Sequence, residues 1–506
     1  MTTEAVYLRL RATDPSRWHA VAAAWRRWAT LAGHLAAEVP PLLVRFAAAW
    51  SGAAARAAAD RLTRLRRGLV VFRVLCWQAD QAVSEFAAAL DRARVLLSRA
   101  IAAATRGGLV IQDDGSVRGG PAATVTPDLS AALSIADRAD AAAAARLAAV
   151  VHDPARPPGP ERPACTASPA EVRRWWSGLT PAEQRWLLAA EPAWLAPLDG
   201  ISAADRDAAN RLLLDDRRAE VERAAAAAHG RALDRLRGLR RGLDALADRL
   251  ADEDGPRAYL LRLDLTGEGR VVVALGDPDH AANVLTHVPG MTSDLASFDG
   301  ELTRAARVAG RATEVAPAAS TSAVLWLDYD APDFLDEAAS ARRAAAAAPA
   351  LRRFQDGLRA THQGPPAHQT VVGHSYGSLV VGKAATGAGL DADDLVFVGS
   401  PGVGVDSAAQ LRVPAGHVWS STSRTDIIQY AAVSPRGIVD TLTRTAGLSG
   451  GFGWPERYLW FGPNPSDPAF GAHTFASQPD AGHLGYWDPG RPALDALAAI
   501  TLGRNP

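Results

Sequence analysis

The spacing of apolar residues changes near Ala258, and this change constrains the fold more than any other feature of the chain. Before it, large apolar side chains recur every three or four residues, as along one face of a helix; Trp18, Val21, Trp25 and Trp28 are one example. After it, short runs rich in Val and Leu alternate with Ala-rich helical stretches. The sequence therefore predicts an α/β fold with a mostly parallel sheet in the C-terminal half, preceded by an all-helical bundle or hairpin.

Local signals divide the first half further. Asp14-Pro15 predicts a helix start, Pro40-Pro41 predicts a break before a second helical stretch, and Asp114-Gly115 predicts the turn of a small β-hairpin. Ser168 and Thr180 each stand three residues before a glutamate, which is typical of a capping box at a helix N-terminus.

Strand signals are confined to the last of three expected regions. These regions are a helical domain at 1–120, a helical linker or lid at 121–254 and the α/β domain at 255–506. In the α/β domain, Thr266-Gly267-Glu268-Gly269 separates two apolar runs and predicts a hairpin. The expected strands are Tyr259–Leu265, Arg270–Leu275, Val284–Val288, Val324–Leu327, Thr370–Val372, Leu395–Val398, His417–Ser420 and Tyr458–Phe461.

Composition excludes several classes of protein. Two cysteines in 506 residues rule out a disulfide scaffold and a cysteine-built zinc site. Residues 1–120 hold 17 arginines and 9 acidic residues, but the charges are interspersed, which favours solvated helix faces over a nucleic-acid partner. No apolar run approaches the ~18 residues of a transmembrane helix, and no ordinary secretory signal opens the chain. We expect a chain without a transmembrane segment, either cytoplasmic or exported without a cleavable signal peptide.

The most specific chemical signal is Gly373-His374-Ser375-Tyr376-Gly377, which matches the pattern G-x-S-x-G. An expected strand precedes it and an expected helix follows, so the serine should lie on the sharp strand-to-helix turn called a nucleophile elbow. Such a turn strains the backbone and holds the serine at the positive end of a helix. We therefore predict that Ser375 is a catalytic nucleophile.

A serine hydroxyl needs a base to become a good nucleophile. In folds with a nucleophile elbow, the acid and then the histidine follow the serine along the chain. His483, in a glycine-flanked loop near the end of the chain, is the preferred base, and His473 is the alternative. Asp426 directly follows an expected strand and is the preferred acid, with Asp406 as the alternative. The predicted triad is thus Ser375, Asp426 and His483.

The oxyanion of an acyl-transfer intermediate needs backbone N–H donors. The N–H of Tyr376, at the start of the helix, is the first expected donor. The second should come from the loop after an early strand, where Gly290 permits close approach of the substrate and Met291 offers its N–H. The expected residues of the substrate pocket are His287, Gly290, His374 and Tyr486.

Several stretches also carry a resemblance to a known family. They are Val271–Asp279, His287–Gly290, Trp326–Pro332, Val371–Gly382, Leu395–Asp406 and Gly482–Asp488, preceded by Leu198–Ile201 and Arg206–Arg211. Through them, residues from about 195 to 506 resemble the actinobacterial α/β-hydrolase family of the domain of unknown function DUF1023. The resemblance implies the α/β-hydrolase fold and the same triad, and it implies no particular substrate.

The N-terminal helices carry a second resemblance. Trp50-Ser51-Gly52 falls between the two expected long helices, so the region resembles WXG100-type modules, which have a W-x-G turn there. This resemblance implies a type VII-like export route, or a helical partner bound through these helices. The usual Y-x-x-x-[DE] export signal is not evident, and a plain helical bundle is the alternative.

The expected function is that of a serine hydrolase, esterase-like or lipase-like, acting on a small-molecule or lipid ester through an acyl-enzyme. An amide or thioester is a less favoured substrate, and the chemistry requires neither a metal nor an organic cofactor. Two alternatives remain: a type VII secretion-associated toxin or effector hydrolase, and a non-catalytic interaction protein that retains the hydrolase fold.

Overall fold

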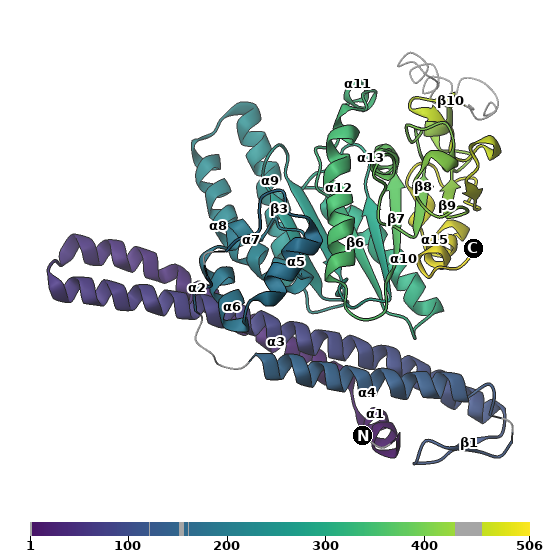
Figure 1. Cartoon of the computed structure of the whole chain (residues 1–506), viewed down its shortest axis with the longest axis horizontal. Coiled ribbons are helices and arrows are strands. Elements are labelled where there is room, and N and C mark those ends of the chain that lie inside the picture. Colours follow the sequence, from purple (N-terminus) through teal and green to yellow (C-terminus); the bar gives the residue numbers. More distant parts are fainter. Residues whose placement is uncertain (1–2, 121, 151–155, 160, 431–457) are drawn as a thin grey trace. The chain divides into compact units, whose positions relative to one another are not determined.

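The computed structural model describes residues 3–120, 122–150, 156–159, 161–430 and 458–506 and divides into two compact units (Figure 1). The helical unit comprises Met1–Pro163, Arg174–Ala196 and Ala251–Arg257. The sheet unit comprises Ala164–Arg173, Pro197–Leu250 and Ala258–Pro506. All of residues 197–250, expected in a linker or lid, therefore belong to the same unit as the sheet.

The helical unit is built around long helices. Its elements are α1 (Thr3–Ala12), α2 (Pro15–Ala49), α3 (Ala53–Arg106), β1 (Val110–Ile111), β2 (Val117–Arg118), α4 (Thr126–Ala149), α6 (Pro181–Ala190) and α7 (Pro192–Leu195), while α5 (Pro169–Gly178) crosses the boundary of the units. The predicted hairpin is confirmed, because β1 pairs antiparallel with β2. The predicted capping box at Thr180 is present, and Trp50-Ser51-Gly52 forms the turn between α2 and α3.

The predicted break at Pro40-Pro41 is wrong, because α2 continues through both prolines to Ala49. A proline inside a helix removes a backbone hydrogen bond and crowds the preceding turn. Both prolines are exposed, so water can reach the carbonyl groups that lose their partners. Packing of α2 along α3 continues past this point and holds the helix together.

The sheet unit contains an eight-stranded sheet of order β12-β9-β8-β7-β5-β6-β4-β3. The strands are β3 (Ala258–Asp264), β4 (Arg270–Leu275), β5 (Asn283–Val288), β6 (Thr321–Leu327), β7 (His368–His374), β8 (Asp394–Val398), β9 (Val418–Ser421) and β12 (His473–Thr474). The β3–β4 and β4–β6 pairs are antiparallel and the other five pairs are parallel. The predicted fold class is thus confirmed.

One expected strand lies elsewhere. Tyr458 and Leu459 form β10, which pairs with β11 (Gly462–Pro463) in a separate two-stranded ribbon. The edge of the main sheet is formed instead by the two residues of β12, which pair parallel with β9. A strand of two residues has no apolar run to mark it, so the sequence pattern did not reveal it.

Helices cover the two faces of the sheet. They are α8 (Ala203–Ala227), α9 (Gly230–Ala251), α10 (Phe298–Val315), α12 (Arg342–Thr361), α13 (Tyr376–Ala385) and α15 (Pro492–Thr501). The connections contain the short helix α11 (Leu335–Ala338) and 3₁₀ turns at Ala408–Gln410, Ile427–Tyr430, Pro468–Phe470 and Gly485–Trp487. Neighbouring residues of β5 show the two layers: Thr286 bonds Gln355 of α12, and His287 bonds Glu301 of α10. Because successive side chains of a strand point to opposite faces, α12 and α10 lie on opposite sides of the sheet.

Buried polar contacts fix α8 to the sheet. Asp207 accepts hydrogen bonds from the N–H of Leu260 at 2.8 Å and from Nε of Arg211 at 2.7 Å, and Arg211 also donates to the carbonyl of Ala258 at 2.8 Å. Both side chains are buried, so these bonds replace the water that they lost. The segment Arg206–Arg211 thus anchors α8 on β3.

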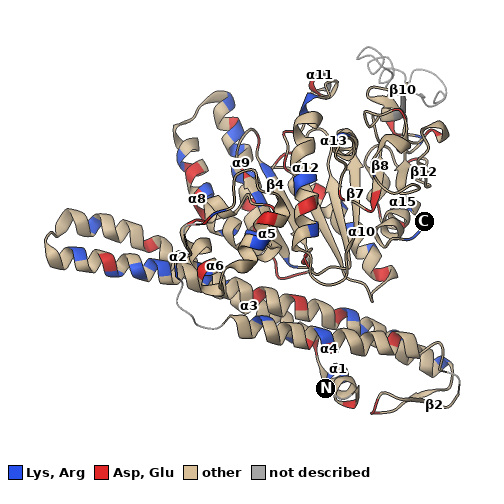
Figure 2. Ribbon diagram, viewed as in Figure 1, with Lys and Arg blue, Asp and Glu red and all other residues tan. Residues whose placement is uncertain are grey.

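Two properties of the surface bear on partners. Basic and acidic residues are interspersed along α3, α4 and α8 (Figure 2). Within the described ranges, no helix combines the length and the apolar character that crossing a membrane requires.

Candidate active site

Ser375 lies on a strained turn between β7 and α13. Its φ of 52° and ψ of −127° are sparsely populated for a residue with a side chain, and such strain costs about 1–3 kcal/mol. The N–H of Ser375 donates to the carbonyl of Val398, at the end of β8, at 3.0 Å. Neighbouring strands therefore hold the turn, and the serine caps the N-terminus of α13, as the G-x-S-x-G pattern predicts.

The two glycines of the pattern make this turn sterically possible. A Cβ atom on Gly373 would lie 2.7 Å from the Cα of Ser378, and one on Gly377 would lie 2.2 Å from the carbonyl oxygen of Val288. Both distances are far below van der Waals contact, so only glycine fits at these positions. The second contact also brings the elbow against the end of β5.

The loop after β5 lies against the serine. A Cβ atom on Gly290 would lie 2.6 Å from the Cβ and 3.1 Å from the Oγ of Ser375. The hydroxyl of Tyr329 donates to the carbonyl of Pro289 at 2.6 Å, and Thr292 has a φ of 63°. This loop is therefore held close to the serine in a strained conformation, with Met291 in its middle.

His483 and Asp426 form a hydrogen-bonded pair. Nδ1 of His483 lies 2.9 Å from Oδ1 and 3.0 Å from Oδ2 of Asp426. A carboxylate only accepts hydrogen bonds, so Nδ1 is the donor to Asp426, and Nε2 is the ring nitrogen left to accept a proton. Asp426 is fully buried, whereas 28% of the His483 side chain is exposed. The arrangement leaves Nε2 as a base oriented by a buried carboxylate.

Two further donors stabilise this carboxylate. The hydroxyl of Tyr486 donates to Oδ2 of Asp426 at 2.6 Å, and the N–H of Ile428 donates to Oδ1 at 3.0 Å. Burial and the neighbouring carboxylate raise the pKa of Tyr486, so it remains a neutral donor. Tyr486 was expected to line the substrate pocket, but it is buried and its hydroxyl contacts the acid.

The alternative residues lie elsewhere. His473 is exposed on β12, with its ring against Trp419 at a centroid distance of 5.1 Å. Asp406 is exposed, and its N–H bonds the side chain of Gln410 at 2.7 Å. The structure therefore gives His473 and Asp406 partners outside the pair of His483 and Asp426.

His374 and His287, the two histidines expected to line the substrate pocket, are both buried. Nε2 of His374 donates to the carbonyl of His483 at 3.0 Å, and burial lowers the pKa of His374, so its ring is neutral. Nε2 of His287 lies 3.0 Å from Oε2 of Glu301. The ring of Trp487 packs edge-on against both histidines, at centroid distances of 4.9 and 5.5 Å. The rings of His374, His287 and Trp487 therefore pack together, and His374 contacts His483 directly.

Glu301, the hydrogen-bond partner of His287, is an acidic residue whose pKa is shifted by this environment. Burial alone would raise the pKa of the Glu301 carboxyl, but the hydrogen bond with His287 and nearby positive charges, including Arg304, lower it to about 2. The carboxylate therefore stays charged. Glu301 and Tyr329 were not predicted as site residues: Glu301 belongs to no local pattern, and Tyr329, just after β6, lies in the stretch Trp326–Pro332 but was given no role.

The two residues expected to donate N–H groups to an oxyanion are neighbours of Ser375 and of Gly290 along the chain. Tyr376 opens α13, whose first N–H groups have no acceptor within the helix, and its hydroxyl is anchored on the carbonyl of Ser340 at 2.6 Å. Met291 lies in the loop that contacts Ser375 through Gly290. Among the residues that the structure describes, no cluster of three or more His, Cys, Asp or Glu side chains could hold a metal ion.

Comparison with known proteins agrees with this architecture. A model of the alpha/beta hydrolase family matches residues 264–435, a range that includes Ser375 and Asp426. The uncharacterized protein Rv2079 of Mycobacterium tuberculosis is 30% identical over 391 residues, which are 70% of this chain and 59% of that protein. The uncharacterized protein Mb0988c of Mycobacterium bovis is 36% identical over 187 residues, 35% of this chain and 69% of that protein. The chain thus spans less than two thirds of the longer relative, and it belongs to an alpha/beta-hydrolase family with mycobacterial members.

Proposed function

We propose that the protein is a serine hydrolase that cleaves carboxylic esters through an acyl-enzyme. The observation that carries the proposal is the buried Asp426 carboxylate bonded to Nδ1 of His483, combined with the strained turn at Ser375. A strained non-glycine residue persists only where surrounding structure holds it, and such residues cluster at active sites. The family supports hydrolysis in general, and the ester is our choice of substrate.

In the proposed reaction, Ser375 Oγ attacks the ester carbonyl while its proton passes to Nε2 of His483. The N–H groups of Tyr376 and Met291 donate to the oxyanion that develops. His483 then gives its proton to the leaving alcohol, and the acyl group remains on Ser375. Water then attacks the acyl-enzyme while His483 takes its proton, and His483 returns this proton to Ser375 Oγ as the acid is released. Asp426 keeps its charge throughout and stabilises the imidazolium.

A fluorophosphonate probe tests the nucleophile directly, because it labels only activated serines. The full-length protein is compared with Ser375→Ala and His483→Ala, with His473→Ala as the matched control. We expect labelling in the wild type and in His473→Ala, and none in the other two. An ester panel from acetyl to long-chain acyl then measures the preferred acyl length.

The result that contradicts the proposal is clear. If folded wild-type protein is neither labelled nor active on any ester, the chain is not a serine esterase and the non-catalytic alternative gains support. If Ser375→Ala retains labelling, the nucleophile is another residue. Circular dichroism of each variant separates loss of chemistry from loss of fold.

A delivered hydrolase of the same chemistry is the second candidate. The observation that favours it is the position of Trp50-Ser51-Gly52 at the turn between two long helices, the arrangement on which the WXG100 resemblance rests. We also propose that the chain belongs to the DUF1023 family. Toxicity that Ser375→Ala relieves, together with protein in the culture supernatant, would support export; protein found only in cells would oppose it.

A further inference from the structure

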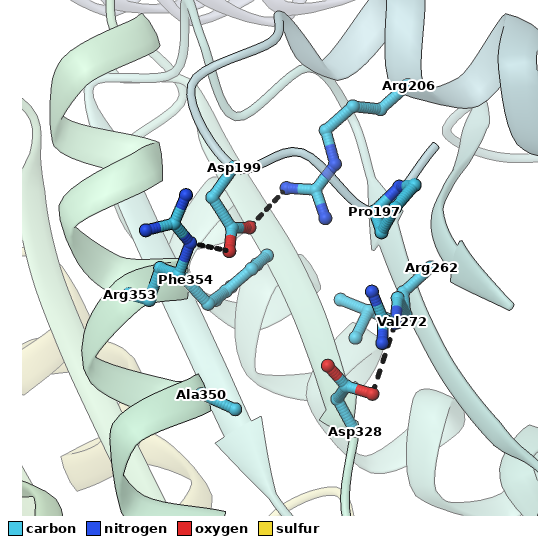
Figure 3. Close-up of a pocket in the computed structure, with 9 residues that line it drawn as sticks. All are labelled: Pro197, Asp199, Arg206, Arg262, Val272, Asp328, Ala350, Arg353 and Phe354. Carbon is cyan, nitrogen blue, oxygen red and sulfur yellow. Dashed lines mark hydrogen bonds and ion pairs between the residues drawn. The ribbon is translucent and has the colours of Figure 1, made fainter. Parts of the chain in front are cut away.

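A cavity of about 240 Å³ lies in the sheet unit, and none of the three triad residues lines it (Figure 3). Its polar lining comes from five different parts of the chain. These residues are Asp199 before α8, Arg206 in α8, Arg262 on β3, Asp328 after β6, and Arg353 on α12, beside Phe354. Segments distant in sequence thus converge on one cavity on the α12 side of the sheet.

The lining carries more positive than negative charge. Asp199 accepts a hydrogen bond from Arg206 at 2.8 Å and lies 3.6 Å from Nε of Arg353. Asp328 lies 3.3 Å from Nε of Arg262 on the opposite side (Figure 3). Guanidinium groups stay protonated in proteins. Three guanidinium groups therefore face two carboxylates, and one positive charge is not balanced by the residues that line the cavity.

The side chain of Arg206 supplies a second, independent observation. Only 6% of the residue is exposed, and its guanidinium lies 5.9 Å from the centre of the Phe354 ring. Its buried Nε makes no hydrogen bond to any residue within the described ranges. Buried donors nearly always have a partner, so this N–H calls for an acceptor.

The shape and chemistry of the cavity limit what can supply that acceptor. A carboxylate or phosphate presents two or more oxygens that match the planar donors of guanidinium groups. At about 240 Å³ the cavity is smaller than the roughly 300–1,000 Å³ of pockets for drug-sized ligands. A small anion would fit the cavity, and an apolar part of it could contact Phe354.

We propose that this cavity is a binding site for a small organic oxyanion, held by Arg206, Arg262 and Arg353. The site gives a role to the stretches Leu198–Ile201 and Arg206–Arg211, which the triad does not use. Leu198–Ile201 contributes Asp199, and Arg206–Arg211 contributes Arg206. The ion pair between these two residues holds the Arg206 guanidinium in place. The site is independent of the proposed esterase reaction.

Binding is measured by calorimetry on the full-length protein, with thermal unfolding as a second readout. The carboxylate probes are acetate and succinate, and the phosphate probes are inorganic phosphate and glycerol 3-phosphate, with chloride at equal ionic strength as the reference. The variants are Arg262→Gln and Arg353→Gln, whose side chains are 26% and 36% exposed, so that both should fold. Arg217→Gln, an exposed residue of α8 paired with Glu220, is the matched control.

We expect saturable binding of at least one probe to the wild type and to Arg217→Gln, and binding weaker by about tenfold or more in both cavity variants. Preference for one pair of probes identifies the anion as a carboxylate or a phosphate. The proposal is overturned if no probe binds the wild type beyond the chloride reference, or if both cavity variants bind as tightly as the wild type. Ser375→Ala should bind normally, so failure of the esterase proposal leaves this one intact.

Discussion

The hydroxyl of Tyr486 lies between Asp426 and Ser423, donating to the carboxylate at 2.6 Å and accepting from the Ser423 N–H at 2.8 Å. This hydroxyl ties the loop that carries His483 to the loop that carries the acid. Because all of these groups are buried or half-buried, the bonds form in a medium where an unpaired polar group is costly. Tyr486 is thus a positioning residue for the pair.

Tyr486→Phe should lower both activity and stability. The change leaves the ring in place but removes the donor to Asp426 and the acceptor for Ser423. We expect the free energy of unfolding to fall by about 1–3 kcal/mol and kcat for ester hydrolysis to fall more than KM rises. Denaturant unfolding and steady-state kinetics measure both. Tyr458→Phe, at an exposed tyrosine, should change neither; an unaltered kcat in Tyr486→Phe would remove its positioning role.

Asp426→Asn should reduce kcat by about 10⁴-fold, because an amide in place of the carboxylate favours the wrong tautomer of His483. Asp406→Asn, the same substitution at the exposed alternative, should leave kcat unchanged. Hydrolysis of a short-chain ester by both variants gives the comparison. Equal losses in the two variants would count against the assignment of the acid.

Gly290→Ala should abolish labelling of Ser375 while the protein remains folded. The new methyl group would lie 2.6 Å from the Cβ of Ser375, so the loop or the serine must move. Misplacement by about 1 Å can cost roughly 10²-fold in rate. Gly300→Ala, on α10 where nothing lies within 4 Å of the new methyl group, is the control and should be fully active. Normal labelling of Gly290→Ala would show that the loop does not approach the serine so closely.

Glu301→Gln should change how stability depends on pH. The pKa of Glu301 is lowered from 4.5 to about 2 in the folded protein, so its charge stabilises the fold fully above about pH 4.5. This contribution, about 3 kcal/mol, is lost as the pH falls from 4.5 toward 2.

The variant should therefore be less stable than the wild type at pH 7, and the difference should narrow below pH 4.5. Urea unfolding at several pH values measures it. Glu314→Gln, at an exposed residue of the same helix, should show little difference at any pH. A gap between Glu301→Gln and wild type that stays constant down to pH 3 would argue against the lowered pKa.

Part of the site could be predicted because its signals are local. Five consecutive residues predict the nucleophile elbow, because the turn brings backbone against backbone at two positions where only glycine fits. His483 and Asp426 could be named from chain order and from their positions after expected strands, although the two are 57 residues apart. The same logic misled at Tyr458–Phe461, where an apolar run forms a separate ribbon and not a strand of the main sheet.

The sequence by itself determined the change from helices to an α/β sheet and the serine on its turn, because apolar spacing and glycine sterics act between near neighbours along the chain. Only the tertiary structure decided that Tyr486 holds Asp426, that Glu301 pairs with His287, and that Arg206, Arg262 and Arg353 surround one cavity. These contacts join residues that lie between 14 and 147 positions apart along the chain. They depend on the order of the strands in the sheet and on which helix covers each face, and no spacing within a single segment encodes either.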